Sequence, residues 1–251
     1  MNMNLFLRRR TLMGAASSGL APVHGTWEDL FARIADGTYA TAYSVGEILP
    51  LDLGTEGNVG AQIAAFNTDD KADNSGKAKI TFITKHVLNT AKRWNPRLSP
   101  SSAPYTEGTG TIGGWAMSEI RAYIRNTVKP LIPSDIRNRI VEVTKKYYTY
   151  NTSGTASIQT IADDVWLPSA GEVFGNYESG TRYSDLFGTA GASAADAKRV
   201  KTKSNSSTAV GWWLRTGSST SRSRLAVTNG SSTGYNSHYT GYFHAVGFCI
   251  D

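Results

Sequence analysis

Residues 212–249 read WWLRTGSSTSRSRLAVTNGSSTGYNSHYTGYFHAVGFC and combine two apolar ends with a long polar middle. The ends, Trp212–Leu214 and Val246–Ile250, are typical of short buried strands. Of the 31 residues from Thr216 to Val246, 25 are Ser, Thr, Gly, Tyr, Asn, Arg or His. The stretch therefore predicts two scaffold strands that hold a polar, tyrosine-rich segment between them.

The polar segment has the composition of a binding surface. Tyr offers a large amphipathic contact area at a small cost in conformational entropy, and Ser, Gly and Asn form adaptable hydrogen bonds. A Ser/Gly-rich linker is the alternative, but a linker needs neither flanking strands nor the apolar Leu225-Ala226-Val227 in its middle. The segment also lacks Lys, Glu, Gln, Met and Trp. These are the residues that cannot arise when a codon ends in a pyrimidine and its first two bases are scrambled.

The candidate ligand-binding residues are the polar ones between the two scaffold strands. Tyr235, Tyr239, Tyr242 and Arg222 are the expected anchors, because aromatic residues and Arg dominate binding hot spots. The full set is Ser218, Ser219, Ser221, Arg222, Arg224, Ser232, Gly234, Tyr235, Ser237, His238, Tyr239, Gly241, Tyr242 and His244. The residues expected to form the rigid core beneath them are Trp212, Trp213, Leu225, Val227 and Phe248.

The rest of the chain predicts a single α+β domain over residues 25–251, behind a basic N-terminal arm over residues 1–24. An export signal of the twin-arginine type is the alternative for the arm. Hydrophobic spacing predicts one helix with Met117, Ile120, Ile124, Val128 and Leu131 on one face. Other expected helices lie within 25–37, 86–92, 133–143 and 168–174. Expected strands lie within 38–53, 59–66, 79–85, 141–150, 165–167, 211–215, 224–228 and 245–250.

Charge and cysteine content narrow the possible partners. Between Ala197 and Ile250 there are seven cations and no acid, which favours a soluble basic surface over specific nucleic-acid binding, because no aromatic-interleaved motif accompanies the charge. The one cysteine, Cys249, excludes an internal disulfide and is expected to be a small buried residue in the final strand. No stretch approaches the roughly 18 apolar residues of a membrane span.

Motifs for catalysis and for cofactors are absent. The sequence contains no phosphate-binding loop, dinucleotide fingerprint, paired-histidine zinc motif or nucleophile-elbow serine. Residues 69–76 carry three aspartates, yet their spacing does not match a calcium-binding loop, so we expect a solvated turn. We therefore expect a protein that is not an enzyme and that uses no metal or cofactor.

Residues 212–249 resemble the variable regions of target proteins of diversity-generating retroelements. Upstream segments resemble a widespread domain of gut phage and bacterial proteins, in the order VGEILPLDLG (45–54), KITFITK (79–85), GWAMSEIRAYI (114–124) and DDVWLPSAGEVFG (163–175). The resemblance implies a C-type-lectin-like fold, similar to formylglycine-generating enzymes, with short antiparallel sheets, a few helices and long loops. The paired active cysteines of those enzymes have no counterpart, and the acid-free segment puts calcium-mediated sugar binding in doubt.

The resemblance also implies a biological setting. It implies a phage receptor-binding or adhesion protein, made in the cytoplasm and placed on a phage tail or a bacterial surface. Residues 216–246 would be diversified by the retroelement and would bind a host cell-surface protein or glycan. Tail proteins and two further copies of the chain, in a homotrimer, are the other expected partners. Two alternatives remain, an invariant tail or baseplate protein without ligand and a surface-glycan hydrolase with a carboxylate pair facing a groove.

Overall fold

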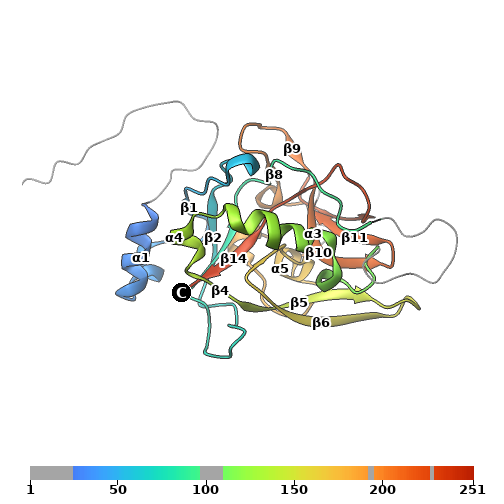
Figure 1. Cartoon of the computed structure of the whole chain (residues 1–251), viewed down its shortest axis with the longest axis horizontal. Coiled ribbons are helices and arrows are strands. Elements are labelled where there is room, and N and C mark those ends of the chain that lie inside the picture. The colour runs from blue at the N-terminus through green and yellow to red at the C-terminus, as the bar shows by residue number, and fades with distance from the viewer. Residues whose placement is uncertain (1–24, 97–109, 192–194, 227–228) are drawn as a thin grey trace, which may run out of the picture.

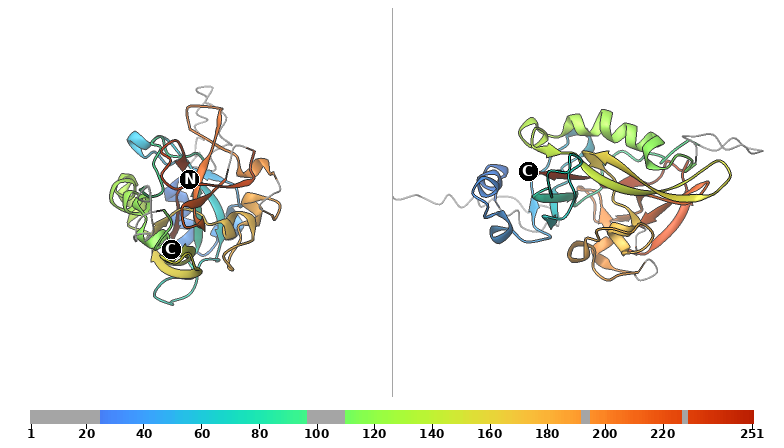
Figure 2. Two further views of the ribbon diagram at one scale, coloured as in Figure 1. Left: turned by 90° about the vertical axis from the view of Figure 1, so that its right-hand side faces the viewer. Right: turned by 90° about the horizontal axis from the view of Figure 1, so that it is seen from below.

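A computed structural model describes residues 25–96, 110–191, 195–226 and 229–251. The expected N-terminal arm lies outside these residues. The chain is a mixed α+β structure with several short, mostly antiparallel sheets and few helices, as expected. Figure 1 shows helix α1 at one end of the molecule and strands β10 and β11 at the opposite end. Figure 2 shows the same separation of the two ends from below.

The helices and strands are as follows. The α-helical segments are α1 (Trp27–Ala35), α2 (Tyr39–Ala42), α3 (Glu119–Tyr123), α4 (Ser134–Arg137), α5 (Ala170–Phe174) and α6 (Ser184–Phe187). The first strands are β1 (Ile48–Leu49), β2 (Ala61–Phe66), β3 (Ile80–Thr84), β4 (Ile140–Val141), β5 (Val143–Tyr150), β6 (Ala156–Asp163) and β7 (Val165–Trp166). The later strands are β8 (Lys201–Thr202), β9 (Ala209–Val210), β10 (Trp212–Ser219), β11 (Arg222–Ala226), β12 (Ser232–Asn236), β13 (Phe243–His244) and β14 (Gly247–Ile250).

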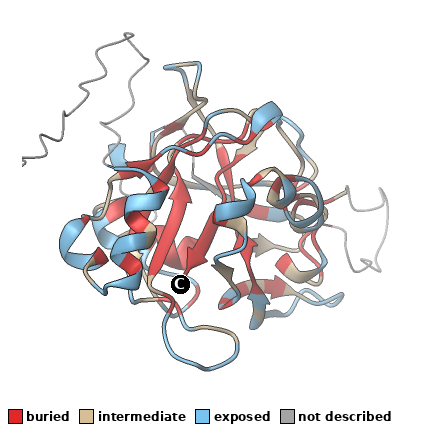
Figure 3. Ribbon diagram, turned by 60° about the vertical axis from the view of Figure 1, so that its left-hand side comes forward, coloured by how far each residue is buried: buried red, intermediate tan, exposed pale blue. Residues whose placement is uncertain are grey.

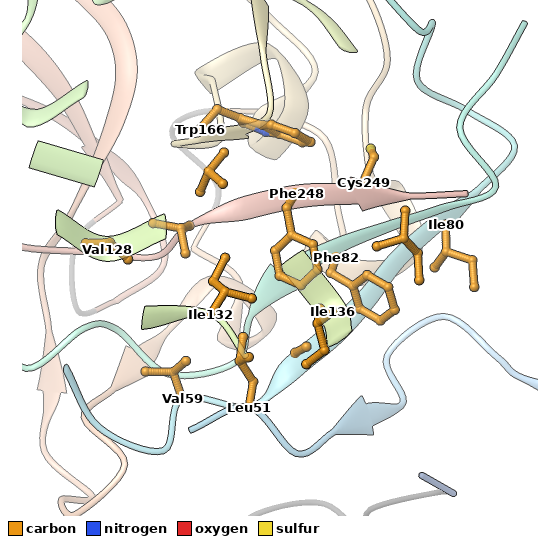
Figure 4. Close-up of a cluster of buried hydrophobic side chains, with 14 of the residues drawn as sticks. Leu51, Val59, Ile80, Phe82, Val128, Ile132, Ile136, Trp166, Phe248 and Cys249 are labelled. Carbon is orange, nitrogen blue, oxygen red and sulfur yellow. The ribbon is translucent and has the colours of Figure 1, made fainter. Parts of the chain in front are cut away.

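The C-terminal strand β14 lies in the middle of a six-stranded sheet. The strand order is β1-β2-β3-β14-β4, and β7 also pairs with β14. All four residues of β14 and all five of β3 are buried (Figure 3). Phe248 lies opposite Phe82, and their rings stack at 5.3 Å. In Figure 4 Phe248 and the next residue, Cys249, point to opposite sides of the strand, so this strand contributes to the packing on both faces of the sheet.

The expected helix over 117–131 forms and covers the sheet. After α3 the helical path continues as a π-helix, Ile124–Val128, and a 3-10 turn, Lys129–Leu131. Ile120, Ile124 and Val128 are fully buried and belong to the same core cluster as Phe248. Met117 was expected on this buried face but is 51% exposed. It precedes the helix proper, which begins after the N-cap Ser118, and so lies off the helical face.

Two other expectations were wrong. Residues 86–92 form no helix, because the backbone N–H groups of His86, Val87 and Leu88 donate to Val59, Thr202 and His244 on three other segments. Residues 38–53 hold the short helix α2 before the strand β1, so they are not all strand. Hydrogen bonds to distant segments decided the conformation of residues 86–92, and a short local helix decided that of residues 39–42. The helix ending at Phe174 is confirmed, and Ser169 caps it by accepting from the Glu172 N–H at 3.1 Å.

The apolar core has two parts. The larger cluster joins α1, the π-helical segment and the six-stranded sheet, and it includes Trp213 and Phe248. The smaller cluster joins α5, α6 and the other side of β10, and it includes Trp212 and Leu214. Adjacent residues of β10 thus enter different clusters, as the alternation of a strand requires. Within the described part of the chain, no helix is long and apolar enough to cross a membrane.

Candidate ligand-binding surface

The polar C-terminal segment forms a four-stranded sheet at one end of the molecule. The strand order is β12-β11-β10-β13, with β13 parallel to β10 and the other pairs antiparallel. Trp212 and Trp213 are fully buried, and their indole N–H groups donate to the carbonyl oxygens of Arg199 (3.1 Å) and Lys92 (2.9 Å). The prediction that these tryptophans form the scaffold is confirmed, and a buried indole with a hydrogen-bond partner fixes the position of the sheet.

A distant segment anchors the loop that follows β12. The backbone N–H groups of Trp94 and Asn95 both donate to the carbonyl of Ser237, at 2.8 and 3.0 Å. The Trp94 ring is fully buried, and its N–H donates to the carbonyl of Leu214 in β10 at 3.1 Å. The backbone of the loop is therefore tied to a segment more than a hundred residues earlier in the chain.

Three tyrosines of this loop and its neighbouring strands gather in ring contact at the surface. The centroid of the Tyr235 ring lies 5.1 Å from that of Tyr239 and 4.8 Å from that of Tyr242. The His238 ring lies tilted beside that of Tyr239, with centroids 5.2 Å apart, and Tyr242 meets the buried Trp213 edge-on at 5.3 Å. We call Tyr235, His238, Tyr239 and Tyr242 the tyrosine surface. Tyr235 is 36% exposed and Tyr239 is 43% exposed, so this surface is open to solvent.

The contacts among the tyrosines also change their chemistry. Burial and a hydrogen bond with Tyr235 raise the pKa of Tyr242 above its ordinary value, so its hydroxyl, neutral at pH 7 like that of any tyrosine, stays protonated further into the alkaline range. A protonated phenol both donates and accepts a hydrogen bond. The tyrosine surface can thus offer apolar ring faces and neutral hydrogen-bonding groups together.

Arg222, the fourth expected anchor, does not join the tyrosines. In the regular β11–β12 pairing Arg222 lies opposite Asn236, and Ser223 lies opposite Tyr235. Because consecutive residues of a strand point to opposite faces, Arg222 and Tyr235 lie on opposite faces of the sheet. The expected anchors are therefore divided between two faces, and only the tyrosines form one patch.

Most of the expected binding residues are exposed or half-buried, and two are fully buried. The accessible ones are Ser218, Ser219, Ser221, Arg222, Gly234, Tyr235, His238, Tyr239, Gly241 and Tyr242, whereas the half-buried Ser232 has its hydroxyl oxygen turned inside. Ser237 is 1% exposed, because its loop is tied down by Trp94 and Asn95, and His244 is fully buried in β13. Both expectations of a displayed side chain were wrong. The side chains of Arg224 and Leu225, and the whole of Val227, lie outside the described residues.

His244 lies in the interior without hydrogen-bond partners for its ring. Neither ring nitrogen has a partner within the described part of the molecule, and the ring meets that of Tyr123 edge-on at 5.7 Å. Burial lowers the pKa of His244 to about 4, although the carboxylate of Glu56 acts in the other direction. The imidazole is therefore neutral at neutral pH and contributes to packing.

Sequence reasoning missed Thr233 and Thr240, which are exposed in the same segment. Both could have been included, because Thr is one of the seven residue types that dominate the polar segment. It also missed the supporting residues Lys92 and Trp94, for which no local signal exists. Their role depends on contacts with β10 and with the loop after β12, far away in the sequence.

Beneath the sheets lies a buried cluster of charges, which we call the Lys145 cluster. The Lys145 ammonium is 1% exposed and lies 2.6 Å from Asp69, 3.2 Å from Glu172 and 2.9 Å from the Tyr183 hydroxyl. Arg215 forms two hydrogen bonds with Glu172, at 2.7 and 2.8 Å. Asp69 was expected in a solvated turn, but it is only 5% exposed. Asp69 is buried because its partners Lys145 and Tyr183 lie on β5 and at the start of α6. These residues are distant in the sequence, so the local pattern around Asp69 does not indicate them.

Carboxylates of this cluster also line a cavity of about 140 Å³. Glu178 accepts hydrogen bonds from the backbone of Gly171 (3.0 Å) and Tyr148 (3.2 Å) and from the Thr216 hydroxyl (2.5 Å). Burial raises the pKa of Glu178, whereas burial of Glu172 is outweighed by Arg215 and Lys145, which hold its pKa below the ordinary value. Within the described residues, no group of acids, histidines or cysteine has a metal-binding arrangement.

The cations of residues 197–250 do not form one basic face. Arg199, Lys201 and Arg215 are each less than 5% exposed. Arg215 belongs to the Lys145 cluster, and the Arg199 side chain donates to the carbonyl of Phe187 at 3.0 Å. The expectation of a basic surface was therefore wrong for these three residues. Cys249 is fully buried in β14, as expected, and burial raises the pKa of its thiol.

Comparison with known proteins places the chain in a family without assigning a function. No curated protein matches the chain, and no solved structure matches it either. A family model described as a domain of unknown function, DUF6273, matches residues 80–251. The match begins at the first residue of β3 and includes the whole four-stranded sheet. Because it spans more than half of the sequence, the chain belongs to the DUF6273 family.

Proposed function

We propose that this protein is a ligand-binding display protein whose tyrosine surface makes the central contact. The observation that carries the proposal is the gathering of Tyr235, Tyr239 and Tyr242 in ring contact on a sheet that buried tryptophans hold in place. The loop is tied through its backbone at Ser237, so ordering it on binding costs little further entropy. A preorganised aromatic patch is the physical form of a binding hot spot.

The setting of this function is also a proposal. A C-type-lectin-type fold, with residues 216–246 diversified by a retroelement, is compatible with the short sheets and with the polar composition of the segment. We propose a host cell-surface protein or glycan as ligand, and a phage tail or bacterial surface as location, with a trimer suited to a tail tip. Such variation is physically tolerable, because side chains at the exposed positions, mostly Tyr, His, Ser and Gly, can change without disturbing the buried scaffold.

The hydrolase alternative receives less support from the side chains. Four acids line the 140 Å³ cavity. Asp69, Glu172 and Glu178 accept hydrogen bonds from protein groups, and the exposed Asp70 is paired with Lys77 at 2.6 Å. A glycosidase needs one carboxyl group free to protonate the leaving oxygen and another free to attack or to activate water. The arrangement around Lys145 favours a structural role for these acids.

A binding experiment tests the proposal directly. Labelled protein is applied to a glycan array and to intact bacterial cells, and the Tyr235→Ala/Tyr239→Ala variant is expected to lose at least tenfold in apparent affinity, because two hot-spot rings are removed. Tyr177→Ala is the matched control, since Tyr177 is 38% exposed and lies outside the surface. Binding by none of the three proteins would favour an invariant structural protein without ligand, and undiminished binding by the double variant would place the ligand contact outside the tyrosine surface.

The proposed variation has a separate test. Sequencing this gene from related isolates is expected to show substitutions concentrated at exposed positions of residues 218–242, with Trp212, Trp213 and Phe248 unchanged. A reverse-transcriptase gene nearby, with an imperfect copy of the C-terminal segment, would identify the mechanism. Substitutions spread evenly along the chain would contradict it.

A further inference from the structure

A second cavity, of about 320 Å³, lies between the end of β3 and the hairpin of β8 and β9. Its ionisable lining residues are Lys85, His86 and Lys201, and three serines of the hairpin contribute hydroxyl groups. None of its lining residues is acidic. The cavity is thus positively charged, and it is separate from the tyrosine surface in its residues.

His86 lines this cavity, and one of its ring nitrogens has no partner among the described residues. The residue is only 7% exposed, and its Nδ1 is held by the carbonyl and the hydroxyl of Thr202, at 3.2 and 3.0 Å. Its Nε2 is buried and has no hydrogen-bond partner within the described residues. A buried polar atom without a partner costs free energy unless a ligand or water satisfies it. These contacts allow two neutral tautomers: Nδ1–H donates to the Thr202 carbonyl and leaves Nε2 an acceptor, or Nδ1 accepts from the Thr202 hydroxyl and Nε2–H is a donor. A bound anion would select the second tautomer.

Lys201 brings a buried charge without a counter-ion. Its side chain is 4% exposed, and its ammonium donates to the carbonyl oxygens of Thr84 (2.6 Å) and Lys85 (3.2 Å). An ammonium has three N–H groups, so one remains beyond these two carbonyls, and the Trp212 ring, whose centroid lies 5.4 Å from Nζ, brings no counter-charge. No carboxylate of the described residues lies within ion-pair distance of it. Burial and the neighbouring Lys85 lower the pKa of Lys201 to about 7, which reflects the cost of this uncompensated charge.

We propose that this cavity binds the phosphate or sulfate group of a ligand. An oxyanion would supply the missing counter-charge for Lys85 and Lys201, and its oxygens would accept from the His86 ring. The hydroxyl of Ser206 already accepts from the Thr208 N–H at 3.0 Å, so its own proton is available to the anion. Charge-assisted hydrogen bonds of this kind are the strong ones. The volume corresponds to about ten water molecules, which leaves space for part of the group that carries the anion.

Isothermal titration calorimetry at constant ionic strength in chloride buffer tests this site. The probes are inorganic phosphate, inorganic sulfate, N-acetylglucosamine 6-sulfate and unsulfated N-acetylglucosamine. We expect saturable one-to-one binding of at least one anionic probe and none of the unsulfated sugar. Binding of the inorganic ions identifies a site for the free anion, whereas binding of the sulfated sugar alone identifies an ester-borne group.

Two variants make the result specific. Lys85→Gln is expected to weaken binding at least tenfold, and it should fold normally because Lys85 is half-exposed. Lys77→Gln removes the same charge from an exposed site outside the cavity and is expected to change the affinity less than twofold. The proposal is overturned if no anionic probe binds saturably, or if both variants weaken binding equally. Neither result bears on the tyrosine surface, because His86, Lys85 and Lys201 are not part of it.

Discussion

Two buried lysines in this protein have opposite surroundings. The ammonium of Lys145 has Asp69, Glu172 and the Tyr183 hydroxyl within hydrogen-bond distance, and these acids raise its pKa against the effect of burial. The ammonium of Lys201 has two backbone carbonyls, and its pKa falls to about 7. The two side chains are equally inaccessible, at 1% and 4% exposure.

The difference between them separates structural from binding roles. A buried charge is tolerated when opposite charges and hydrogen bonds surround it, as in the Lys145 cluster. A buried cation without an acid keeps its desolvation cost until an anion arrives. The first arrangement stabilises the junction of β5, α5 and β10. The second leaves the Lys201 ammonium without a counter-charge, and an anion bound in the cavity beside β8 would supply one.

Removing Lys145 is expected to have the largest effect. Lys145→Met leaves Asp69 buried without its ammonium partner, so the free energy of unfolding should fall by about 3–5 kcal/mol. Urea unfolding followed by circular dichroism measures the loss. Lys146→Met is the control, because the neighbouring lysine is exposed on the other face of β5 and should change stability by less than about 0.5 kcal/mol. Similar losses in the two variants would contradict the assigned role.

The pH dependence of stability should reveal Lys201. Its pKa is about 7 when folded and 10.5 as the ordinary value, so between these limits the unfolded chain binds more protons. The free energy of unfolding should therefore rise with pH from 7 to 10, by up to about 1.4 kcal/mol per pH unit. The difference between wild type and Lys201→Met, measured by urea unfolding in chloride buffer, isolates this contribution. An identical slope in both proteins would show that Lys201 is not desolvated.

His244 provides a third case, a buried base with neither acid nor hydrogen-bond partner at its ring nitrogens among the described groups. Its pKa is about 4 when folded and 6.5 ordinarily, so the unfolded chain again binds more protons between these values. Its contribution to stability is complete above pH 6.5 and is lost as the pH falls towards 4, by up to about 1.4 kcal/mol per unit. Thermal unfolding of His244→Phe should show a weaker loss over this window than wild type. Equal acid sensitivity would argue against a buried neutral imidazole.

The smallest effect is expected for an exposed ion pair. Lys77 and Asp70 lie 2.6 Å apart, but their side chains are 48% and 71% exposed. Solvent screens such pairs, so Lys77→Gln should change the free energy of unfolding by less than about 0.5 kcal/mol. Urea unfolding measures this change under the conditions used for Lys145→Met. If Lys77→Gln lowered the free energy of unfolding as much as Lys145→Met, burial would not be what makes the Lys145 cluster important for stability.

The sequence predicted the elements whose hydrophobic pattern is strong. The helix over 117–131, the strands around Ile80 and Phe248, and the capped helix after Ser169 all form. Strand β6 was missed because six of its eight residues are exposed, so no buried face imposes the sustained apolar alternation of a half-buried strand. The expected helix after His86 failed because three separate segments pair with its backbone.

The candidate site was predictable in composition but not in arrangement. The residue types of the C-terminal segment pointed to Tyr235, Tyr239 and Tyr242, which lie together. The register of β11 and β12 placed Arg222 on the other face, and the anchoring by Trp94 buried Ser237. The cavity beside β8 escaped sequence analysis, because His86 and Lys201 are more than a hundred residues apart.

The sequence by itself determined which segments are apolar enough to be buried, where helices are capped, and which residue types are available for binding. These properties depend on spacing and on side-chain chemistry over a few residues. Only the tertiary structure decided which charges are paired. Asp69, Lys145 and Arg215 come from three distant segments and meet in one cluster, whereas Lys201 meets no acid of the segments that the structure describes. The electrostatic energy of a buried charge depends on separation in space, which a linear pattern does not contain.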